Sequence, residues 1–360
     1  MSANVEAPNS TEVIRRAVAQ LPRLSETAFD TVANRRVLDE NIEALRAAGL
    51  FKVILAKRYG GFQHDLHTHL KTTEELATAC GSTAWVTAVY QAHSWLMGLY
   101  PHRAQDDVFG SDSENLVAGV LAPRGNAKPV KGGYAVTGFY PFCSGCHHAA
   151  WFMFGALVKN DADEAIKAGI FLMEPGEVKI QDDWDAGGLA GTGSNSVFVD
   201  KIVVPEHRVL WFEPAIAGKA PGIVLHDATL YRNALVPALT IFLTGPALGM
   251  ARSACEHFIT MLPGREVTHM NGALQSESTT THVELAEAHT KTDTARLLLH
   301  SCVAEMQEAA ANDVLIPVKV RAKIRMDCSY AVRLCLEATE LLYVATGGRG
   351  LANNSRIQLA

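Results

Sequence analysis

Cys143, Cys146 and His147 stand at a spacing that could do chemistry. They match the C-x-x-C-H pattern of haem attachment, and the cysteine pair alone matches half of a zinc site or a redox dithiol. A zinc site needs a second pair of ligands, and the sequence has no other Cys-x-x-Cys. A redox dithiol belongs at the start of a helix, whereas this pair follows an extended run and precedes a strand. We therefore predict no metal site, and we interpret the cysteines as small residues that let the backbone approach a flat ligand.

His93 is a second candidate for chemistry. It lies in the run from Ser82 to Tyr100, which is apolar nearly all round and which Ser82 or Thr83 could cap. A helix of that composition is normally buried, and a lone histidine on it is more often a core residue whose hydrogen bonds are satisfied. An imidazole beside a substrate hydroxyl would instead accept or share its proton. From the residues alone, both interpretations of His93 stay open.

The remaining pattern of apolar residues predicts three successive regions. Helical spacing dominates up to residue 113, with clear helices over 37–50, 66–80 and 82–100. Strands with short turns follow over 134–142, 150–158, 169–174 and 196–204, and the glycine-rich run 187–193 does not lead from a strand into a helix. Long helices return over 235–262, with a kink at Pro246, and over 283–311 and 318–345. The predicted fold class is α+β: an N-terminal helical domain (1–113), an antiparallel β-domain (114–222) and a C-terminal helical bundle (223–360).

Composition limits the class of protein. Apolar residues make up 48% of the chain and charged residues 19%, which excludes a disordered chain. The net charge of −6 gives no field for nucleic acid, and no apolar run reaches the roughly 18 residues that span a membrane. Seven cysteines, an odd number, fit reduced thiols better than a disulfide framework. We therefore expect a cytoplasmic protein with neither nucleic acid nor a membrane as partner.

The order of the three regions resembles the acyl-CoA dehydrogenase fold, and short motifs narrow the resemblance. They are Tyr59-Gly-Gly, Gly81-Ser-Thr-Ala-Trp85, Ala92-His-Ser, Ala122-Pro123, Ser144-Gly-Cys and Gly191-Thr-Gly-Ser-Asn195. In this order and spacing they resemble the oxygenase components of two-component flavin-dependent monooxygenases. That group includes 4-hydroxyphenylacetate hydroxylase and the 3-HSA hydroxylase of bacterial steroid-ring degradation. The resemblance covers essentially the whole chain.

The resemblance implies a mechanism and partners. A separate flavin reductase supplies reduced FMN or FAD, and the oxygenase adds O2 to form a C4a-hydroperoxide. This intermediate hydroxylates an aromatic, phenolic or polycyclic substrate. Such chemistry needs a dry, largely apolar pocket, which the helix around Trp85 and an expected strand of small residues over 142–146 could build. The resemblance also implies a homotetramer.

The resemblance further implies roles for individual residues. His93 and Ser144 are catalytic: His93 faces the substrate hydroxyl and Ser144 lies near flavin N5. His93, Gly119 and Val120 contact the substrate. The cofactor contacts are Trp85, Phe142, Cys143, Ser144, Gly193, Ser194, Arg265, Gly347, Gly348 and Gln358, with Arg265 and the last three expected to reach the flavin of a neighbouring subunit.

The sequence departs from the family pattern at three places. Gly119 replaces a substrate-side serine, and Ala190 replaces an arginine. The family also continues beyond Gln358 with an Arg-Asp pair and a later catalytic histidine, so the resemblance predicts that the bundle extends past residue 360. Gly119 in place of serine leaves room for substrates other than phenols.

Three alternatives remain in view. An acyl-CoA dehydrogenase needs a carboxylate base, but Ala352 stands at the usual position and no Asp or Glu occurs from Ala228 to Cys255. An N- or S-oxygenase of the same fold is the second alternative, and a flavin-free binding protein is the third.

Overall fold

The computed structural model describes residues 7–267, 271–352 and 354–359. Its N-terminal region is helical, as the sequence predicts. The helices are α1 (Ser10–Val18), α2 (Leu21–Glu26), α3 (Ala28–Ala33), α4 (Asp39–Ala47), α5 (Leu66–Ala77), α6 (Gly81–Met97) and α7 (His102–Phe109). Helix α6 is buried along almost its whole length, in line with its apolar composition. It starts after Cys80, and neither Ser82 nor Thr83 caps it, so that expectation was wrong.

The middle region is one seven-stranded sheet. Its strands are β1 (Val117–Val130), β2 (Gly133–Tyr140), β3 (Trp151–Lys159), β4 (Ala165–Met173), β5 (Lys179–Gln181), β6 (Ser196–Val204) and β7 (Val209–Trp211). They lie in the order β5-β6-β2-β1-β3-β4-β7. The α+β class is confirmed, but the sheet is mixed rather than wholly antiparallel, because β1 pairs with β3 in parallel.

The segment 142–146 is a turn and not the expected strand. Phe142 and Gly145 both have left-handed backbone angles, with φ of 64° and 72°. At Gly145 a Cβ atom would lie 2.6 Å from the hydroxyl of Tyr90, so only glycine fits there. Tyr90 also donates a hydrogen bond to the carbonyl of Gly145. The turn is thereby held against α6.

Among the residues that the structure describes, the α-helices that follow the sheet are α8 (Phe212–Ile216), α9 (Leu235–Ile241), α10 (Gly245–Met261), α11 (Thr279–Ala311) and α12 (Val318–Thr346). The predicted helix 235–262 is interrupted rather than kinked, because α9 ends and α10 starts again with Pro246 in its first turn. Leu235–Met261 is long and apolar enough to cross a membrane, but 61% of its most apolar window is buried in this fold, as in the core helix of a soluble protein. The two domain boundaries remain predictions.

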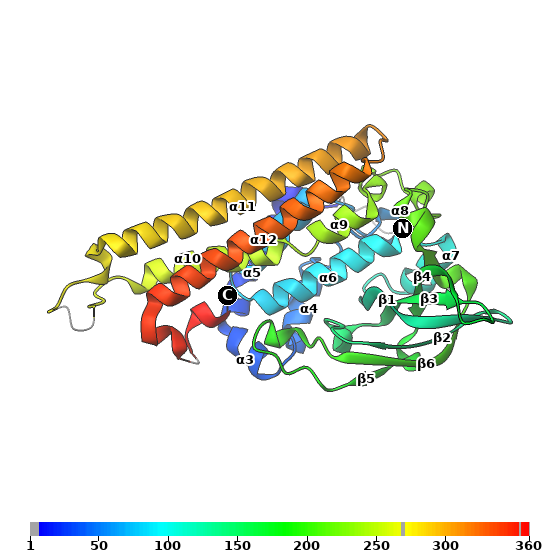
Figure 1. Cartoon of the computed structure of the whole chain (residues 1–360), viewed down its shortest axis with the longest axis horizontal. Coiled ribbons are helices and arrows are strands. Elements are labelled where there is room, and N and C mark those ends of the chain that lie inside the picture. Colours follow the sequence, from blue (N-terminus) through cyan, green and yellow to red (C-terminus); the bar gives the residue numbers. More distant parts are fainter. Residues whose placement is uncertain (1–6, 268–270, 353, 360) are drawn as a thin grey trace, which may run out of the picture.

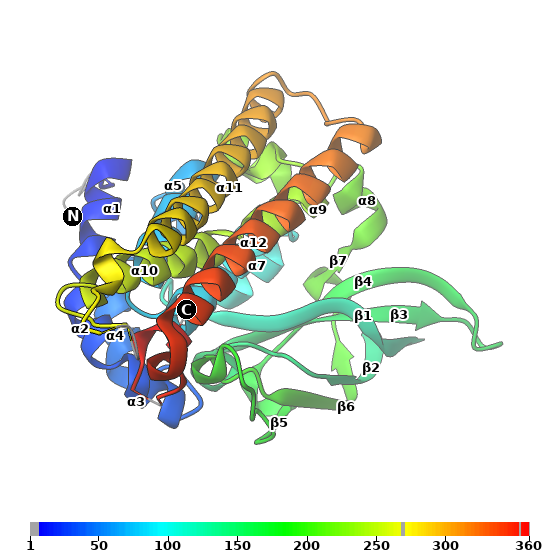
Figure 2. The ribbon, with the colours of Figure 1, turned by 60° about the vertical axis from the view of Figure 1, so that its left-hand side comes forward.

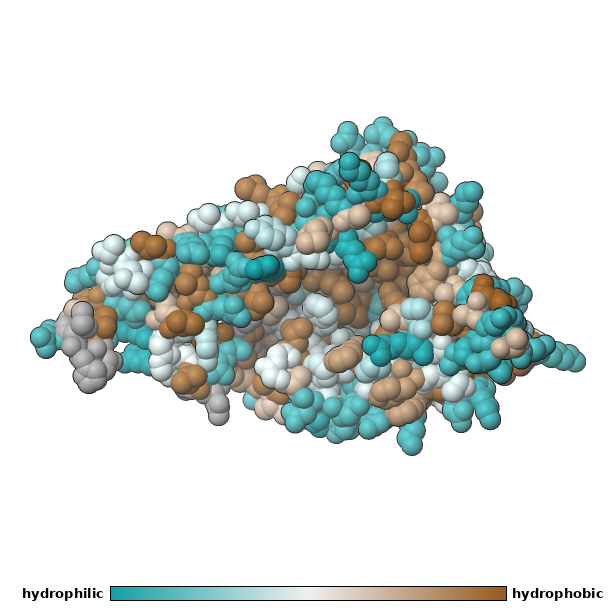
Figure 3. Space-filling view, viewed as in Figure 1, coloured by the Kyte–Doolittle hydropathy of each residue, from teal (hydrophilic) through white to brown (hydrophobic). Residues whose placement is uncertain are grey.

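The helices and the sheet form two layers. Figure 1 shows α11 and α12 running along one side of the molecule, with the sheet on the other and α6 between them. Figure 2, turned by 60°, shows the same separation. In the space-filling view, apolar side chains gather in a hollow between the long helices and the sheet (Figure 3). Helix α6, which carries His93, therefore runs along the junction of the two layers.

Candidate active site

A cavity of about 260 Å³ lies against α6. Its walls come from four parts of the chain: α6, β1, the 142–144 turn and the end of α9. The lining residues are Trp85, Val89, Ala92, His93, Gly119, Leu121, Phe142, Ser144, Leu239 and Leu243. None of them carries a carboxylate, an ammonium or a guanidinium group. The cavity is thus apolar, with one imidazole, one hydroxyl and one indole N–H in its walls.

The tautomer of His93 follows from its single hydrogen bond. The ring is only 5% exposed, and Nδ1 lies 2.8 Å from the carbonyl oxygen of Val117. A carbonyl oxygen only accepts, so Nδ1 carries the proton. Burial lowers the pKa of His93 to about 4, so the ring is neutral at physiological pH. Its Nε2 is therefore a hydrogen-bond acceptor with no proton of its own.

Ser144 lies at the centre of a short hydrogen-bond chain. Its Oγ accepts a bond from Nε1 of Trp85 at 3.1 Å and lies 2.8 Å from Oγ of Ser194. Oγ of Ser194 is in turn 2.7 Å from Oγ1 of Thr192. Three residues predicted to contact the cofactor, Trp85, Ser144 and Ser194, are thereby brought together. The hydroxyl of Ser144 is held in place at the cavity wall.

Phe142 combines an exposed aromatic side chain with an unfavourable backbone conformation. Its side chain is 66% exposed, although it is a large aromatic group at the rim of the cavity. Its φ of 64° is unfavourable for a residue with a side chain. An exposed aromatic ring held by a strained turn is typical of a binding site. A flat, apolar ring system with few polar atoms, such as that of a flavin, fits this wall.

His69, a buried histidine on α5, contacts two of the elements that carry cavity residues. Pro246 has no N–H to donate to the carbonyl of Phe242, four residues earlier, so the helix break leaves that acceptor free. Nε2 of His69 donates to it at 2.9 Å, and Nδ1 of His69 lies 2.6 Å from Oε1 of Gln91. Gln91 precedes Ala92 and His93 on α6. His69 thus ties the break after α9 to the helix that carries His93.

Not every predicted contact lies in the cavity. Cys143 is fully buried behind the turn, and burial raises the pKa of its thiol well above the usual range. Gly193 meets the turn through its carbonyl, which accepts a bond from Sγ of Cys146 at 3.4 Å. Val120 is not among the lining residues; Leu121 and Gly119 are. Successive side chains of a strand point to opposite faces, so Leu121 lies where Val120 was expected.

Gly119 has a structural reason to be glycine. It pairs with Met153 where β1 and β3 run in parallel. A Cβ at this position would lie 2.1 Å from the carbonyl oxygen of Met153. A serine here would therefore require β1 to move away from β3. The departure from the family pattern is coupled to the close approach of the two strands.

Arg265, Gly347 and Gly348 gather at a different place, where α10 and α12 end. Nη2 of Arg265 donates to the carbonyl of Thr346, next to Gly347, whose φ is 62°. Burial, together with the nearby Arg349, lowers the pKa of Arg265. None of these residues lines the cavity beside His93. Their expected role toward a neighbouring subunit stays a prediction.

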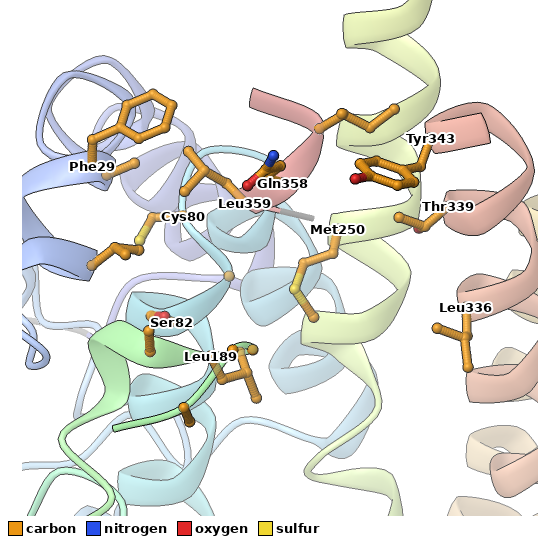
Figure 4. Close-up of a pocket in the computed structure, with 18 of the residues that line it drawn as sticks. Phe29, Cys80, Ser82, Leu189, Met250, Leu336, Thr339, Tyr343, Gln358 and Leu359 are labelled. Atoms are coloured by element: carbon orange, nitrogen blue, oxygen red, sulfur yellow. The ribbon is translucent and has the colours of Figure 1, made fainter. Parts of the chain in front are cut away.

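Gln358 lines a second cavity, of about 480 Å³, shown in Figure 4. Met250 of α10, Tyr343 of α12 and Leu189 of the glycine-rich loop project around it, beside Ser82 at the start of α6. The expected extension of the bundle past residue 360 lies outside the described residues. Gln358 therefore shares a cavity with its own chain's α6.

The two cavities follow one stripe of α6. Gly81 and Ser82 line the larger cavity, while Trp85, Val89, Ala92 and His93 line the smaller one. Residues three and four apart lie on one face of a helix. From Ser82 to His93 the stripe extends about 16 Å at 1.5 Å per residue. A long ligand could thus contact both cavities along a single helix.

Sequence reasoning missed five wall residues: Val89, Ala92, Leu121, Leu239 and Leu243. The helical spacing from His93 to Val89 and Trp85 was a signal for the α6 side of the wall. No local signal points to Leu239 or Leu243, since α9 meets the site only through tertiary packing. The absence of Asp and Glu among the lining residues leaves acyl-CoA dehydrogenation without a base in this cavity.

The fold and the site together define a class of protein. Two protein-family models match the sequence. "Acyl-CoA dehydrogenase, N-terminal domain" matches residues 11–105, and "Acyl-CoA dehydrogenase, C-terminal domain" matches residues 241–359. The chain thus has the acyl-CoA dehydrogenase fold, with an active-site cavity that lacks the dehydrogenase base.

Three similar proteins narrow the class. The chain is 31% identical over 345 residues to the flavin-dependent monooxygenase oxygenase subunit HsaA of Rhodococcus jostii, covering 96% of this chain and 90% of that protein. It is 31% identical over 352 residues to the oxygenase component of the FADH2-dependent resorcinol hydroxylase of Rhizobium, covering 95% and 85%. The crystal structure of 3-HSA hydroxylase from Rhodococcus matches with a TM-score of 0.91 and 31% identity, over 96% of this chain and 89% of that one. The chain belongs to the family of oxygenase components of flavin-dependent monooxygenases.

Proposed function

We propose that this protein binds reduced FMN or FAD from a separate reductase and hydroxylates a small aromatic substrate. Reduced flavin, when bound, supplies the two electrons with which one atom of O2 enters an aromatic C–H bond as C–OH and the other leaves as water. The proposal rests on one observation above all. His93 presents an unprotonated Nε2 in an apolar cavity whose wall also holds the hydroxyl of Ser144.

The residues have separate tasks in this proposal. Trp85 and Phe142 bound the flat ring system of the cofactor. Ser144, fixed by the Trp85 N–H, offers its hydroxyl to a polar atom of that ring. His93 accepts a hydrogen bond from the substrate hydroxyl and takes up its proton as the ring carbon is attacked. The apolar walls exclude water from the reacting atoms.

The second cavity gives the cofactor room beyond its ring system. It continues the α6 stripe past Trp85 to Ser82. Gln358, which the resemblance assigns to the flavin of a neighbouring subunit, lines the same cavity. The Rhizobium relative is named for its dependence on FADH2. Anaerobic titration with reduced FMN and with reduced FAD would show which of the two binds more tightly.

A direct assay tests the proposed function. The protein is mixed with photoreduced flavin, O2 and a panel of phenols that includes resorcinol, and hydroxylated products are identified by mass spectrometry with 18O2. We expect one labelled oxygen per product. H2O2 and oxidised flavin without any labelled product, for every phenol and both flavins, would contradict the proposal.

Two variants make the assay specific to the site. His93→Ala should retain flavin binding and lose product, because it removes the acceptor for the substrate hydroxyl and leaves the residues assigned to the flavin in place. His289→Ala is the matched control, since His289 is an exposed histidine on α11. Equal product from both variants would contradict the role proposed for His93.

We further propose that the protein assembles as a homotetramer through the outer faces of α11 and α12. Large apolar side chains are exposed along both helices: Val283, Leu297, Val318, Met326, Tyr330 and Val344. Extended exposed apolar surface of this kind supports burial in an interface. The number of subunits comes from the family resemblance.

Light scattering after size-exclusion chromatography tests the assembly. The double substitution Met326→Glu and Tyr330→Glu places two charges on the exposed face of α12 and should reduce the mass of the particle. Lys319→Glu, an exposed change on the same helix, is the control. A wild-type protein that elutes as a monomer would contradict the proposal.

We also propose a cytoplasmic location. All seven cysteines are buried free thiols, which suits a reducing compartment. Fractionation of cells that express the tagged protein would test this, and recovery in an oxidising compartment would overturn it.

A further inference from the structure

The polar groups in the wall of the His93 cavity differ in whether a protein atom already takes up their hydrogen bonds. The indole N–H of Trp85 is used by Ser144, and the hydroxyl of Ser144 is paired with Ser194. His93 uses Nδ1 for Val117. Within the described part of the chain, its Nε2 has no hydrogen-bond partner. The cavity therefore offers a ligand one free nitrogen acceptor.

The same cavity offers an anion neither a cation nor a free N–H group. None of its ten lining residues is Lys or Arg, and the only imidazole is neutral with its N–H turned toward Val117. A carboxylate that entered would lose its water without gaining a charged or N–H partner, which is strongly unfavourable. A neutral group that donates one hydrogen bond would satisfy Nε2 instead.

The size of the cavity limits the ligand further. Its volume is about 260 Å³, below the roughly 300–1,000 Å³ of ordinary ligand pockets. Trp85, Phe142 and Ser144 are also assigned to the cofactor, so part of this volume is shared. Leu239 and Leu243 add two branched apolar side chains to the wall.

We propose that, among arenes with an O–H or ring N–H that can donate to His93, the cavity accepts neutral compounds of one or two rings and excludes those with a carboxylate. This inference rests on the proposed function and specifies its substrate class. The donor hydrogen-bonds to Nε2 of His93, and the apolar walls hold the rings. Selection against a carboxylate arises from the absence of any cation in the wall.

Binding measured without turnover tests this selection separately. Quenching of tryptophan fluorescence, with equilibrium dialysis as a second method, gives Kd values for the full chain with and without oxidised FAD. The probes are 2-naphthol, 2-methoxynaphthalene, which lacks the donor, and 6-hydroxy-2-naphthoate, which adds a carboxylate. We expect binding about 10-fold weaker without the donor and at least about 100-fold weaker with the carboxylate.

Variants test which residues impose the order. His93→Ala should abolish the difference between 2-naphthol and 2-methoxynaphthalene. Leu121→Lys should strengthen binding of 6-hydroxy-2-naphthoate at least about 10-fold by giving the carboxylate a partner, whereas Leu121→Met should not. If Leu121→Lys fails to fold by circular dichroism, Leu239→Lys serves the same purpose from the opposite wall.

The outcomes separate this inference from the proposed function. Equal affinity for the three probes, no binding of 2-naphthol, or a donor preference that survives in His93→Ala would overturn the inference even if the protein hydroxylates phenols. The expected order of affinities supports the inference even if the 18O2 assay yields no product, and that result would overturn the proposed function alone.

Discussion

Two histidines in this protein are buried to the same degree but lie in different surroundings. His69, on α5, is packed against α6 and the end of α9: its Nε2 donates to the carbonyl of Phe242 at 2.9 Å, and its Nδ1 lies 2.6 Å from Oε1 of Gln91. His93, which lies on α6, uses one nitrogen and presents the other to a cavity. Burial lowers the pKa of each to about 4.

The comparison shows that burial and a shifted pKa do not identify a functional histidine. What distinguishes His93 is the free acceptor beside a space large enough for a ligand. Both ring nitrogens of His69 already lie against protein oxygens, of Phe242 and Gln91, so this side chain connects α5 to α6 and to the end of α9 and leaves no nitrogen for a ligand. The predictions below test this difference, from the largest expected effect to the smallest.

His93→Ala should reduce kcat for hydroxylation by about 100-fold or more, because a proton acceptor at the substrate is lost. Stopped-flow measurement of product formation checks this. Thermal unfolding should change less than in His69→Leu, since, among the described residues, the carbonyl of Val117 is the one protein group that loses its hydrogen bond to His93. A large loss of stability with activity retained would place His93 beside His69 as a structural residue.

His69→Leu should lower the free energy of unfolding by about 3 kcal/mol, because the Phe242 carbonyl and the Gln91 amide lose a partner. Urea denaturation followed by circular dichroism measures it. Thr290→Leu, an exposed change on α11, is a control for added apolar surface. An unchanged unfolding midpoint would mean that His69 does not fasten the helix break.

Acid should destabilise the protein through both histidines. Their folded pKa values, about 4, lie below the unfolded value of 6.5, so the unfolded chain binds more protons as the pH falls. Stability is full above pH 6.5, and each histidine removes about 2 kcal/mol between pH 6.5 and 5. Urea titrations at several pH values should show a shallower decline in His93→Gln than in wild type, while His289→Gln should match wild type. Parallel declines in all three proteins would contradict a neutral, buried His93.

Ser144→Ala should have the smallest effect, with the ratio of H2O2 to product rising about 10-fold as one hydrogen bond to the cofactor is lost. Peroxide and product are measured in the same reaction. Ser253→Ala removes a hydroxyl that bonds only to the carbonyl of Thr78 on α5's end and should leave the ratio unchanged. Equal ratios in wild type and Ser144→Ala would remove Ser144 from the cofactor site.

Regular elements could be predicted where apolar residues form a long, nearly continuous run. The segment of α6, apolar nearly all round, and the apolar run of β3 are read directly from the sequence. β1 was missed because Pro123 and two glycines interrupt it and its pairing with β3 shifts between Val120 and Gly125. The family resemblance implied Val120 as a substrate contact, whereas Gly119 and Leu121 are the β1 residues that line the cavity.

The site itself was predictable only in part. His93, Ser144 and Trp85 could be proposed because short motifs carry them, and they do meet in one place. Leu239 and Leu243 could not be proposed, since α9 and the residues that follow it lie more than a hundred residues after His93 in the sequence. Their position depends on the helix break at Pro246. His69, which donates to the Phe242 carbonyl that this break leaves free, has no local sequence signal.

The break between α9 and α10 has a consequence for how such an enzyme changes. It leaves one part of the cavity wall on the seven-residue helix α9, which carries Leu239, and on the break that follows it, which carries Leu243. Substitutions at Leu239 and Leu243 can therefore reshape the space opposite His93 while α10, α11 and α12 keep their packing. The molecule separates the part that selects a ligand from the part that supports the scaffold, so new specificities can arise from a few changes in one short segment.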